Sequence, residues 1–313
     1  VTSISRIKIT PEVDSQSVSI QLDGRGDWKG SMADIQILDG DKVITQAAAP
    51  VDAPINVKID SPRLWSPDTP FLYRLKISIR KDGNQIDSIK SYFGMRKIAI
   101  SPDAKGIPRI TLNGKEIMQV GPLDQGFWPA GLYTAPTDDA LKSDLQMAKK
   151  LGFNCVRKHV KIEPQRWYYW ADKLGLLVWQ DMPSTFASQP GDWQKQFETE
   201  LSAMVEQHFN SPAIIMWVPF NEGWGQSPWA KEGTKHIVDL IKKLDPSRLV
   251  DNASGWTDAG AGDVHDIHVY PGPVAPAIEK SRAIVLGEFG GLGRNVPGHM
   301  WDAKHWGYQN LES

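Results

Sequence analysis

The stretch that decides the fold is FNCVRKHVKIEPQRWYYWADKLGLLVWQ, residues 153–180. It opens with a short apolar run typical of a buried strand, continues with a helical run from Glu163 to Leu174, and closes with a second apolar strand. Strands that alternate with helices predict a parallel sheet. The alternation continues on both sides, with helices expected at 137–150, 193–209 and 230–244 and strands at 116–120, 213–218, 248–250, 264–269 and 283–286.

This alternation favours a (β/α)₈ TIM barrel over an open doubly wound sheet. A doubly wound sheet that binds a nucleotide carries a glycine-rich loop after its first strand, and the sequence has no such loop there. Seven strands are visible, whereas a complete barrel has eight. We therefore predict a TIM barrel over residues 103–313 that ends before its eighth strand.

Residues 1–102 have a different periodicity. Apolar and polar residues alternate with a period of two, as in 18–22 and 72–79. Such short alternating strands predict an antiparallel β-sandwich that forms a separate N-terminal domain. Asp-Gly pairs favour tight turns. They punctuate these strands at Asp23-Gly24, Asp39-Gly40 and Asp82-Gly83.

The composition narrows the class of function. A formal net charge of −2 gives no broad electrostatic footprint for nucleic acid, so we expect no nucleic-acid partner. Cys155 is the single cysteine, which excludes an internal disulfide and a cysteine-based zinc site. No run approaches the ~20 apolar residues of a membrane span. No charged-then-apolar leader follows Val1, so we expect neither a span nor a signal peptide in this sequence.

Two glutamates stand where TIM barrels place their chemistry. Reacting groups in these barrels gather at the carboxyl ends of the strands. Glu222 follows the expected strand at 213–218, and Glu288 follows the one at 283–286. An ionised glutamate at a partly buried strand end is unfavourable without compensation. A retaining glycosidase needs such a pair, one carboxylic acid as proton donor and one carboxylate as nucleophile about 5–5.5 Å away.

Two further residues are expected to act on Glu288. Arg157, at the end of the second strand, is placed to keep Glu288 charged, and Tyr270, at the end of the sixth, is placed to donate a hydrogen bond to it. Each residue also has a structural interpretation. Arg157 then pairs with a structural acid, and Tyr270 caps a turn before Pro271.

Other polar and aromatic residues are candidates for contacts with a sugar. The faces of sugar rings are apolar and their edges are polar, so tryptophans beside hydrogen-bonding groups suit them, and the sequence has 13 tryptophans. For most of these tryptophans, and for each polar candidate, an ordinary structural position is the alternative. The candidates are His159, Asp181, Trp224, Trp256 and His268.

These motifs resemble a known family. The run IIMWVPFNE at 214–222 resembles the Asn-Glu motif of glycoside hydrolase family 2, the group of β-galactosidases, β-glucuronidases and β-mannosidases. The runs LGEFG at 286–290 and FNCVRKH at 153–159 are similar to its nucleophile strand and its second strand. LWSPDTP at 64–70 and YFGMR at 92–96 are similar to the end of its immunoglobulin-like domain and the entry to its barrel.

The resemblance implies an immunoglobulin-like domain at 1–102, Glu222 as acid/base, Glu288 as nucleophile, and a contact from Asn221 to the sugar 2-hydroxyl. The expected function is a retaining exo-β-glycosidase for a glycoside or oligosaccharide, β-galactosidase-like by default, without cofactor or metal. The alternative is a non-catalytic glycan-binding protein or an inactive fragment of the same family. The resemblance also implies a periplasmic or extracellular bacterial location.

The sequence departs from the family where the sugar pocket is expected. Many members read His-Tyr-Pro after the second strand, whereas this chain reads His159-Val-Lys161. Many read Asp-Glu after the third strand, whereas this chain reads Gln180-Asp181. The resemblance therefore does not imply that this chain acts on the same sugar as the better-known family members.

Overall fold

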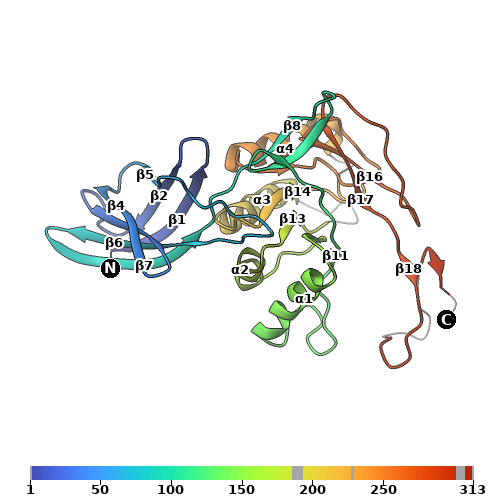
Figure 1. The fold of residues 1–313 in the computed structure, drawn as a ribbon, viewed down its shortest axis with the longest axis horizontal. Helices are drawn as coiled ribbons and strands as arrows, with labels where there is room; N and C mark the ends of the chain where they lie inside the picture. Colours follow the sequence, from blue (N-terminus) through green and yellow to red (C-terminus); the bar gives the residue numbers. More distant parts are fainter. Residues whose placement is uncertain (1, 185–192, 227–228, 301–306, 312–313) are drawn as a thin grey trace.

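Two units follow each other along the chain, a β-sandwich and a barrel of strands and helices (Figure 1). The computed structural model of the protein describes residues 2–184, 193–226, 229–300 and 307–311. The sandwich, coloured blue to cyan, lies at one end of the molecule, and the green to orange barrel elements lie beside it.

The sandwich consists of two antiparallel sheets with the strand orders β1-β2-β5 and β4-β3-β6-β7. Inward side chains of both sheets, such as Ile20 and Ile77, meet in one buried cluster. Burial of each such side chain contributes roughly 1.5–3 kcal/mol. The strands are β1 (Ser3–Glu12), β2 (Ser17–Arg25), β3 (Met32–Asp39), β4 (Lys42–Pro50), β5 (Ile55–Lys58), β6 (Tyr73–Lys81) and β7 (Asn84–Phe93).

Two of the three predicted Asp-Gly turns are confirmed. One joins β3 to β4 after Asp39, and the other joins β6 to β7 at Asp82-Gly83, where both residues have positive φ. The prediction at Asp23-Gly24 is wrong, because both residues lie inside β2. The indole of Trp28 packs against Gly24, where a Cβ would lie 1.9 Å from the ring. Glycine is required there by a close approach, not by a turn.

A small antiparallel sheet of order β10-β9-β8 connects the two units. Ile98 and Ile110 of this sheet pack in the hydrophobic cluster of the barrel, whereas Met95 still belongs to the cluster of the sandwich. In this stretch of the chain the change of core therefore falls between Met95 and Ile98. The strands are β8 (Ile98–Pro102), β9 (Pro108–Leu112) and β10 (Lys115–Glu116).

The barrel wall is built from the parallel strands β11 to β17 in the described part of the chain. Strands β11 to β15 pair in sequence order, and β16 pairs with β17. The strands are β11 (Leu123–Asp124), β12 (Cys155–Lys158), β13 (Leu177–Asp181), β14 (Ile214–Val218), β15 (Leu249–Val250), β16 (Val264–His268) and β17 (Ala283–Glu288), and a further parallel pair is formed by β18 (Leu292–Gly293) and β19 (Gln309–Asn310).

Four helices alternate with the first barrel strands, as the sequence predicts. They begin and end within two residues of the predicted bounds. Thr137 caps the first of them, since its hydroxyl accepts a hydrogen bond from the amide of Ala140 at 3.0 Å. The helices are α1 (Asp138–Lys150), α2 (Gln165–Leu174), α3 (Trp193–His208) and α4 (Ala230–Leu244). No helix in the described ranges is both long enough and apolar enough to cross a membrane.

The predicted first barrel strand at 116–120 is wrong. Met118 and Val120 are exposed, and the strand forms later, at Leu123–Asp124. The chain before it lies directly against β12, because a Cβ on Gly121 would stand 2.1 Å from the carbonyl oxygen of Cys155. An apolar run therefore resembles a strand here without being one.

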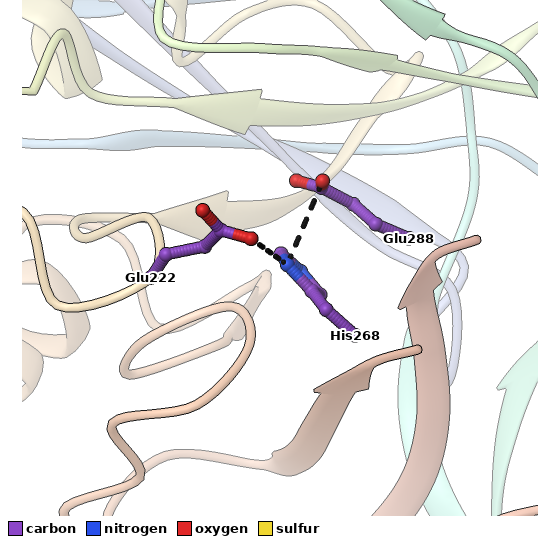
Figure 2. Close-up of side chains that lie close together, drawn as sticks. All are labelled: Glu222, His268 and Glu288. Carbon is purple, nitrogen blue, oxygen red and sulfur yellow. Dashed lines mark hydrogen bonds and ion pairs between the residues drawn. The ribbon is translucent and has the colours of Figure 1, made fainter. Parts of the chain in front are cut away.

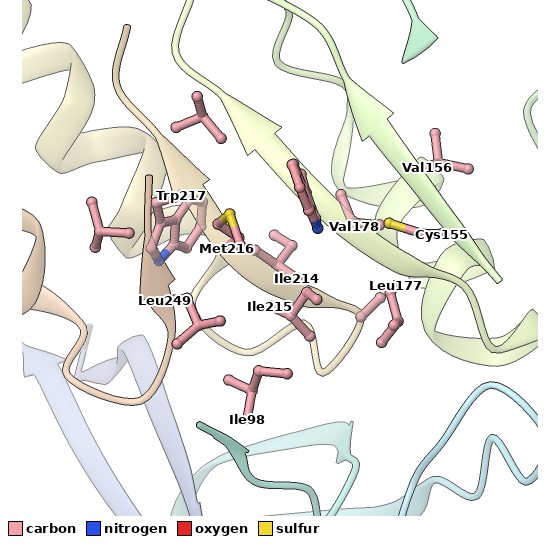
Figure 3. Close-up of a cluster of buried hydrophobic side chains, with 14 of the residues drawn as sticks. Ile98, Cys155, Val156, Leu177, Val178, Ile214, Ile215, Met216, Trp217 and Leu249 are labelled. Atoms are coloured by element: carbon pink, nitrogen blue, oxygen red, sulfur yellow. The ribbon is translucent and has the colours of Figure 1, made fainter. Parts of the chain in front are cut away.

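The core of the barrel consists of aliphatic and aromatic side chains from adjacent strands (Figure 3). Val178 of β13 and Trp217 of β14 are fully buried in it. Cys155 lies in the same cluster, and burial raises the pKa of its thiol to about 12. The strands are thereby fixed, and their carboxyl ends form a rigid base for a site.

Buried polar contacts join the sandwich to the barrel. The indole of Trp65 belongs to the barrel cluster, and its nitrogen donates to the carbonyl of Asp172 at 2.8 Å. The hydroxyl of Tyr92 donates to the carboxylate of Asp172 at 2.8 Å. The guanidinium of Arg96 donates to the carbonyls of Pro212 and Ile214 at 3.0 and 2.8 Å. These hydrogen bonds tie the two units together, while each unit keeps its own hydrophobic cluster.

Candidate active site

The carboxyl ends of β14, β16 and β17 bring two glutamates and a histidine together. Glu222 follows β14, whereas His268 ends β16 and Glu288 ends β17. Figure 2 shows the imidazole of His268 next to both carboxyl groups. Oxygens of Glu222 and Glu288 approach within 4.8 Å of each other, although the residues are far apart in the sequence. The predicted pairing of these two glutamates in space is therefore present.

Both carboxylate oxygens of Glu288 are held by donors. Nη1 of Arg157 donates to Oε1 at 2.9 Å, and the hydroxyl of Tyr270 donates to Oε2 through a short hydrogen bond. Nε2 of His159 lies 3.5 Å from Oε1. The Glu288 side chain is 7% exposed. A cation and a phenol thus compensate a buried negative charge.

Arg157 connects Glu288 to two other strand ends. Its Nε and Nη2 donate to the carboxylate of Asp181 at 3.1 and 2.8 Å, and Nη2 also donates to Oδ1 of Asn221 at 2.8 Å. Burial alone lowers the pKa of the guanidinium, but the charges of Asp181 and Glu288 outweigh burial and raise it. Arg157 therefore remains a fixed positive charge.

Glu222 has a different environment. Its Oε1 lies 2.8 Å from Nδ1 of His268, and its side chain is 15% exposed. Its φ of 52° lies in the left-handed region, where a residue other than glycine is strained by roughly 1–3 kcal/mol. The amide of Glu222 donates to the carbonyl of Ser254 at 2.7 Å, which fixes this conformation. The two neighbouring carboxyl groups thus have unlike surroundings.

Three polar residues behind His268 were not predicted from the sequence. The hydroxyl of Ser254 lies 2.7 Å from Nε2 of His268 and donates to Oδ2 of Asp266 at 2.5 Å. Asp251 is fully buried beside Asp266. Strand periodicity offered a signal, because Asp266 and His268 are two residues apart and therefore lie on the same face of β16.

The remaining candidates lie around this group at different exposures. Asp181 is 1% exposed and its carboxylate accepts both donors from Arg157, so its position is that of a partner of the arginine. Nδ1 of His159 contacts the amide nitrogen of Gln125 at 3.1 Å. Trp256 is exposed and donates from its indole nitrogen to the carbonyl of His268 at 3.2 Å. Trp224 is exposed two residues beyond Glu222.

Glu222, His268 and Glu288 are also residue types that bind metals, and their atoms lie within 4.8 Å of one another. Both oxygens of Glu288 already accept hydrogen bonds, one from Arg157 and one from Tyr270. The fixed charge of Arg157 opposes a second cation at this distance. The arrangement fits an acid–base group better than a metal centre.

Comparison with protein families gives two matches in sequence order. The model described as "Glycosyl hydrolases family 2" matches residues 2–96, and the model "Glycosyl hydrolases family 2, TIM barrel domain" matches residues 109–270. These matches confirm the predicted family and the order of an immunoglobulin-like domain and a TIM barrel. The second model alone covers more than half of the chain.

Curated relatives of this chain are named β-glucuronidase or β-galactosidase. A β-glucuronidase of Bacteroides fragilis is 29% identical over 270 residues, which is 79% of this chain and 37% of the relative. A β-galactosidase of Vibrio vulnificus is 25% identical over 299 residues, which is 87% of this chain and 26% of the relative. The chain thus spans well under half the length of these relatives.

Solved structures share the fold. A β-glucuronidase of Parabacteroides merdae with glycerol in its active site has a TM-score of 0.74 at 21% identity and covers 87% of this chain and 36% of its own. A β-galacturonidase of Eisenbergiella tayi bound to galacturonate has a TM-score of 0.71 at 22% identity. The match covers 86% of this chain and 50% of the β-galacturonidase chain. Two family models match this chain in sequence order, and one of them covers more than half of the chain. The chain therefore belongs to family 2 of the glycosyl hydrolases.

Proposed function

We propose that this chain carries the reacting carboxyl groups of a retaining exo-β-glycosidase, with Glu288 as nucleophile and Glu222 as acid/base. The observation that carries the proposal is the approach of their oxygens to within 4.8 Å. Retaining glycosidases hold the two carboxyl groups about 5–5.5 Å apart, whereas inverting enzymes need about 6.5–9.5 Å to admit a water molecule. The short separation supports direct attack by a carboxylate.

The assignment of roles rests on the two environments. Glu288 accepts hydrogen bonds from Arg157 and Tyr270, which favour its ionised form, and a nucleophile must be ionised. Glu222 faces His268, whose pKa is lowered to about 4, chiefly by burial. His268 is therefore neutral near pH 7, and within the described part of the chain no cation pairs with Glu222 to oppose its protonation.

The reaction then proceeds in two steps. The carboxylic acid of Glu222 gives its proton to the glycosidic oxygen, while an oxygen of Glu288 attacks the anomeric carbon and the bond to the leaving group breaks. In the second step Glu222 takes a proton from water, the water oxygen attacks the anomeric carbon, and the ester to Glu288 breaks. Arg157 holds Oδ1 of Asn221, so the amide N–H groups of Asn221 are the ones available to the sugar 2-hydroxyl.

The substrate class is a terminal β-linked sugar, with a β-galactoside as the first candidate. The names of the relatives give equal weight to a β-glucuronide. Trp256, exposed beside His268, supports a sugar site because its ring offers an apolar face to a ligand there.

The test is hydrolysis of aryl β-glycosides by the full chain. The panel contains the galactoside, glucoside, mannoside, glucuronide and xyloside, and nuclear magnetic resonance identifies the anomer released first. We expect cleavage of one sugar with the β-anomer appearing first, and a loss of at least about 10³-fold in Glu288→Ala and Glu222→Ala. Glu200→Ala, on the exposed face of α3, is the matched control.

The outcomes separate the alternatives. Release of the α-anomer, or near-normal turnover by Glu288→Ala, would contradict the proposal. Binding of the sugars without turnover of any glycoside would favour the alternative of a glycan-binding protein.

A further inference from the structure

A continuous line of hydrogen bonds runs from Glu222 into the interior of the barrel. Oε1 of Glu222 contacts Nδ1 of His268, and Nε2 of the same ring contacts the hydroxyl of Ser254 at 2.7 Å. Ser254 contacts Oδ2 of Asp266 at 2.5 Å, and Oδ1 of Asp266 accepts from the amide of Gly287 at 2.6 Å. The imidazole, hydroxyl and carboxyl groups of this line are buried, except for that of Glu222 itself, whose side chain is 15% exposed.

When Asp266 is ionised, the protons on this line can point in only one direction. Ser254 has one hydroxyl proton, and an ionised Asp266 can only accept it. The serine oxygen, 2.7 Å from Nε2 of His268, then accepts from Nε2–H. Nη1 of Arg157 lies farther from this nitrogen, at 3.4 Å, and donates to Glu288 at 2.9 Å. With its proton on Nε2, the neutral ring has none on Nδ1. A bare Nδ1 beside Oε1 of Glu222 requires a proton on Glu222, because two acceptors do not attract each other.

We propose that Asp266 and Ser254 are positioning residues that set the tautomer of His268 and thereby keep Glu222 in its acid form before glycosyl transfer. This inference rests on the proposed function, because it explains how the acid/base residue is loaded with its proton. It assigns a task to Ser254 and Asp266, which are buried behind His268.

The geometry also allows the line to run in the opposite direction. If Glu222 gives its proton to Nδ1, Nε2–H passes its proton to the serine oxygen and the serine hydroxyl proton moves to Asp266. One proton then leaves Glu222 and one arrives at Asp266, His268 stays neutral, and no atom is gained or lost. Asp266 therefore acts as a reservoir for the proton of the acid/base residue.

The charges around the line agree with a shared proton. Burial raises the pKa of Asp266 to about 6, against the opposing charge of Arg157. Burial and then the charge of Asp266 raise the pKa of its neighbour Asp251 well above the usual range. The other charged or titratable groups that face His268 are Glu288, Arg157 and His159.

Gly287 shows how closely this line is packed. A Cβ at that position would lie 2.0 Å from an oxygen of Asp266, so only glycine permits the amide to donate to that carboxylate. Since Oδ1 of Asp266 accepts from the Gly287 amide, Oδ2 is the atom that faces Ser254. Because the orientation of the Asp266 carboxylate is fixed, a single substitution there can reverse the donor–acceptor direction of every hydrogen bond between it and Glu222.

The decisive variant is Asp266→Asn. Its amide oxygen must still accept from Gly287, so its amide nitrogen faces Ser254 and donates to the hydroxyl oxygen. The serine proton then turns to Nε2, and Nδ1–H of His268 faces an ionised Glu222. Every hydrogen bond is retained while the direction is reversed, so the variant keeps its fold. Ser254→Ala interrupts the line instead.

The first measurement compares two leaving groups on the sugar that the unsubstituted protein cleaves. A dinitrophenolate leaves without a proton, whereas a phenolate needs the general acid. We expect Asp266→Asn and Ser254→Ala to lower kcat/KM about tenfold or more for the phenyl glycoside and less than about threefold for the dinitrophenyl glycoside. The basic limb of the pH profile moves to lower pH in Asp266→Asn.

The matched control is Ser211→Ala, which also removes a buried serine that donates to a buried aspartate, Asp172, at 2.6 Å. Both substrates should respond to it equally and by less than about twofold. Equal losses on both substrates in Asp266→Asn, or no loss at all, would overturn the proposal.

The second measurement does not depend on turnover. Nitrogen-15 resonances of His268, assigned with His268→Gln, report which ring nitrogen carries the proton. We expect Nε2–H in the unsubstituted protein and Nδ1–H in Asp266→Asn. Nδ1–H in the unsubstituted protein contradicts the inference. A protein with the expected tautomer that cleaves no glycoside contradicts the proposed function instead, so the two failures are distinguishable.

Discussion

Arg157 is the residue on which most of the site converges. Its guanidinium donates to Asp181, Asn221 and Glu288 on three different strand ends. The planar guanidinium spreads its donors over three nitrogen atoms and so reaches oxygens on three strand ends, whereas a lysine has all its donors on one atom. The carboxylate of Asp181 fixes the guanidinium, and the guanidinium in turn fixes the proposed nucleophile.

Arg157→Lys should therefore keep the charge and lose the alignment. We expect kcat/KM to fall about 10²-fold or more, mainly through kcat, because at least two charge-assisted hydrogen bonds are lost. Steady-state kinetics on the cleaved aryl glycoside measures this, with thermal unfolding as a check on folding. Tyr270→Phe removes one hydrogen bond to Glu288 and should have a smaller effect. Activity of Arg157→Lys within about threefold of the unsubstituted protein would show that charge alone suffices.

At the scale of elements, the helices were predictable because they carry local signals. α1 has a threonine cap, aspartates in its first turn and lysines in its last turn, and all three signals are contiguous in the sequence. The strand ends that carry Glu222 and Glu288 were likewise found from buried apolar runs followed by a polar residue. The two wrong elements have another cause. At 116–120 the conformation depends on Cys155, a residue distant in the sequence, whose amide donates to the carbonyl of Val120. At Asp23-Gly24 it depends on the indole of Trp28, which packs against Gly24.

Ser254 and Asp266 were not predicted because their roles, too, depend on contacts with other segments of the chain. Ser254 lies in a loop after β15, and its role depends on two atoms from β16 that approach it in space. Asp266 and His268 are two residues apart and so lie on the same face of β16. The sequence alone does not show that Asp266 is a buried strand residue, because its hydrogen-bond partner comes from another part of the chain. Periodicity shows which face a residue occupies and does not show what lies opposite.

The cap of α1 gives a prediction at this scale. Thr137→Ala removes the acceptor of the Ala140 amide and should lower the free energy of unfolding by about 1 kcal/mol. Unfolding in urea measures the change. The matched control is Ser143→Ala, an exposed mid-helix position where alanine is the better helix former, and it should be neutral or slightly stabilising. A larger loss in the control than in Thr137→Ala would contradict this account of the cap.

For the whole molecule, the interface between sandwich and barrel is centred on Asp172. Its carboxylate accepts hydrogen bonds from Tyr92 of the sandwich and from Ser211 and the Ala213 amide of the barrel. Burial nevertheless raises its pKa to about 6. Because the folded state binds this proton more tightly than the unfolded chain, the resulting stability is fully present below the ordinary value of 3.8 and is lost as the pH rises through about 6.

Asp172→Asn should remove this pH dependence, because a neutral amide has no proton to lose. From about pH 5 to about pH 7.5 the unsubstituted protein should lose about 1 kcal/mol more stability than the variant, as expected for one raised carboxyl pKa. Urea unfolding at both pH values measures the difference. Asp41→Asn, at a fully exposed side chain, is the control and should follow the unsubstituted protein. An identical pH dependence in Asp172→Asn would mean that the proton is bound elsewhere.

The position of Trp65 has a consequence for engineering. Its ring lies in the interior of the barrel although its backbone belongs to the sandwich side of the chain. A chimera that joins this barrel to the N-terminal domain of a relative will leave a vacant slot beside α2 unless the donor supplies an indole at the same place. The exchangeable module is therefore the sandwich together with its LWSPDTP segment, and the crossover point for such grafts lies after Arg96.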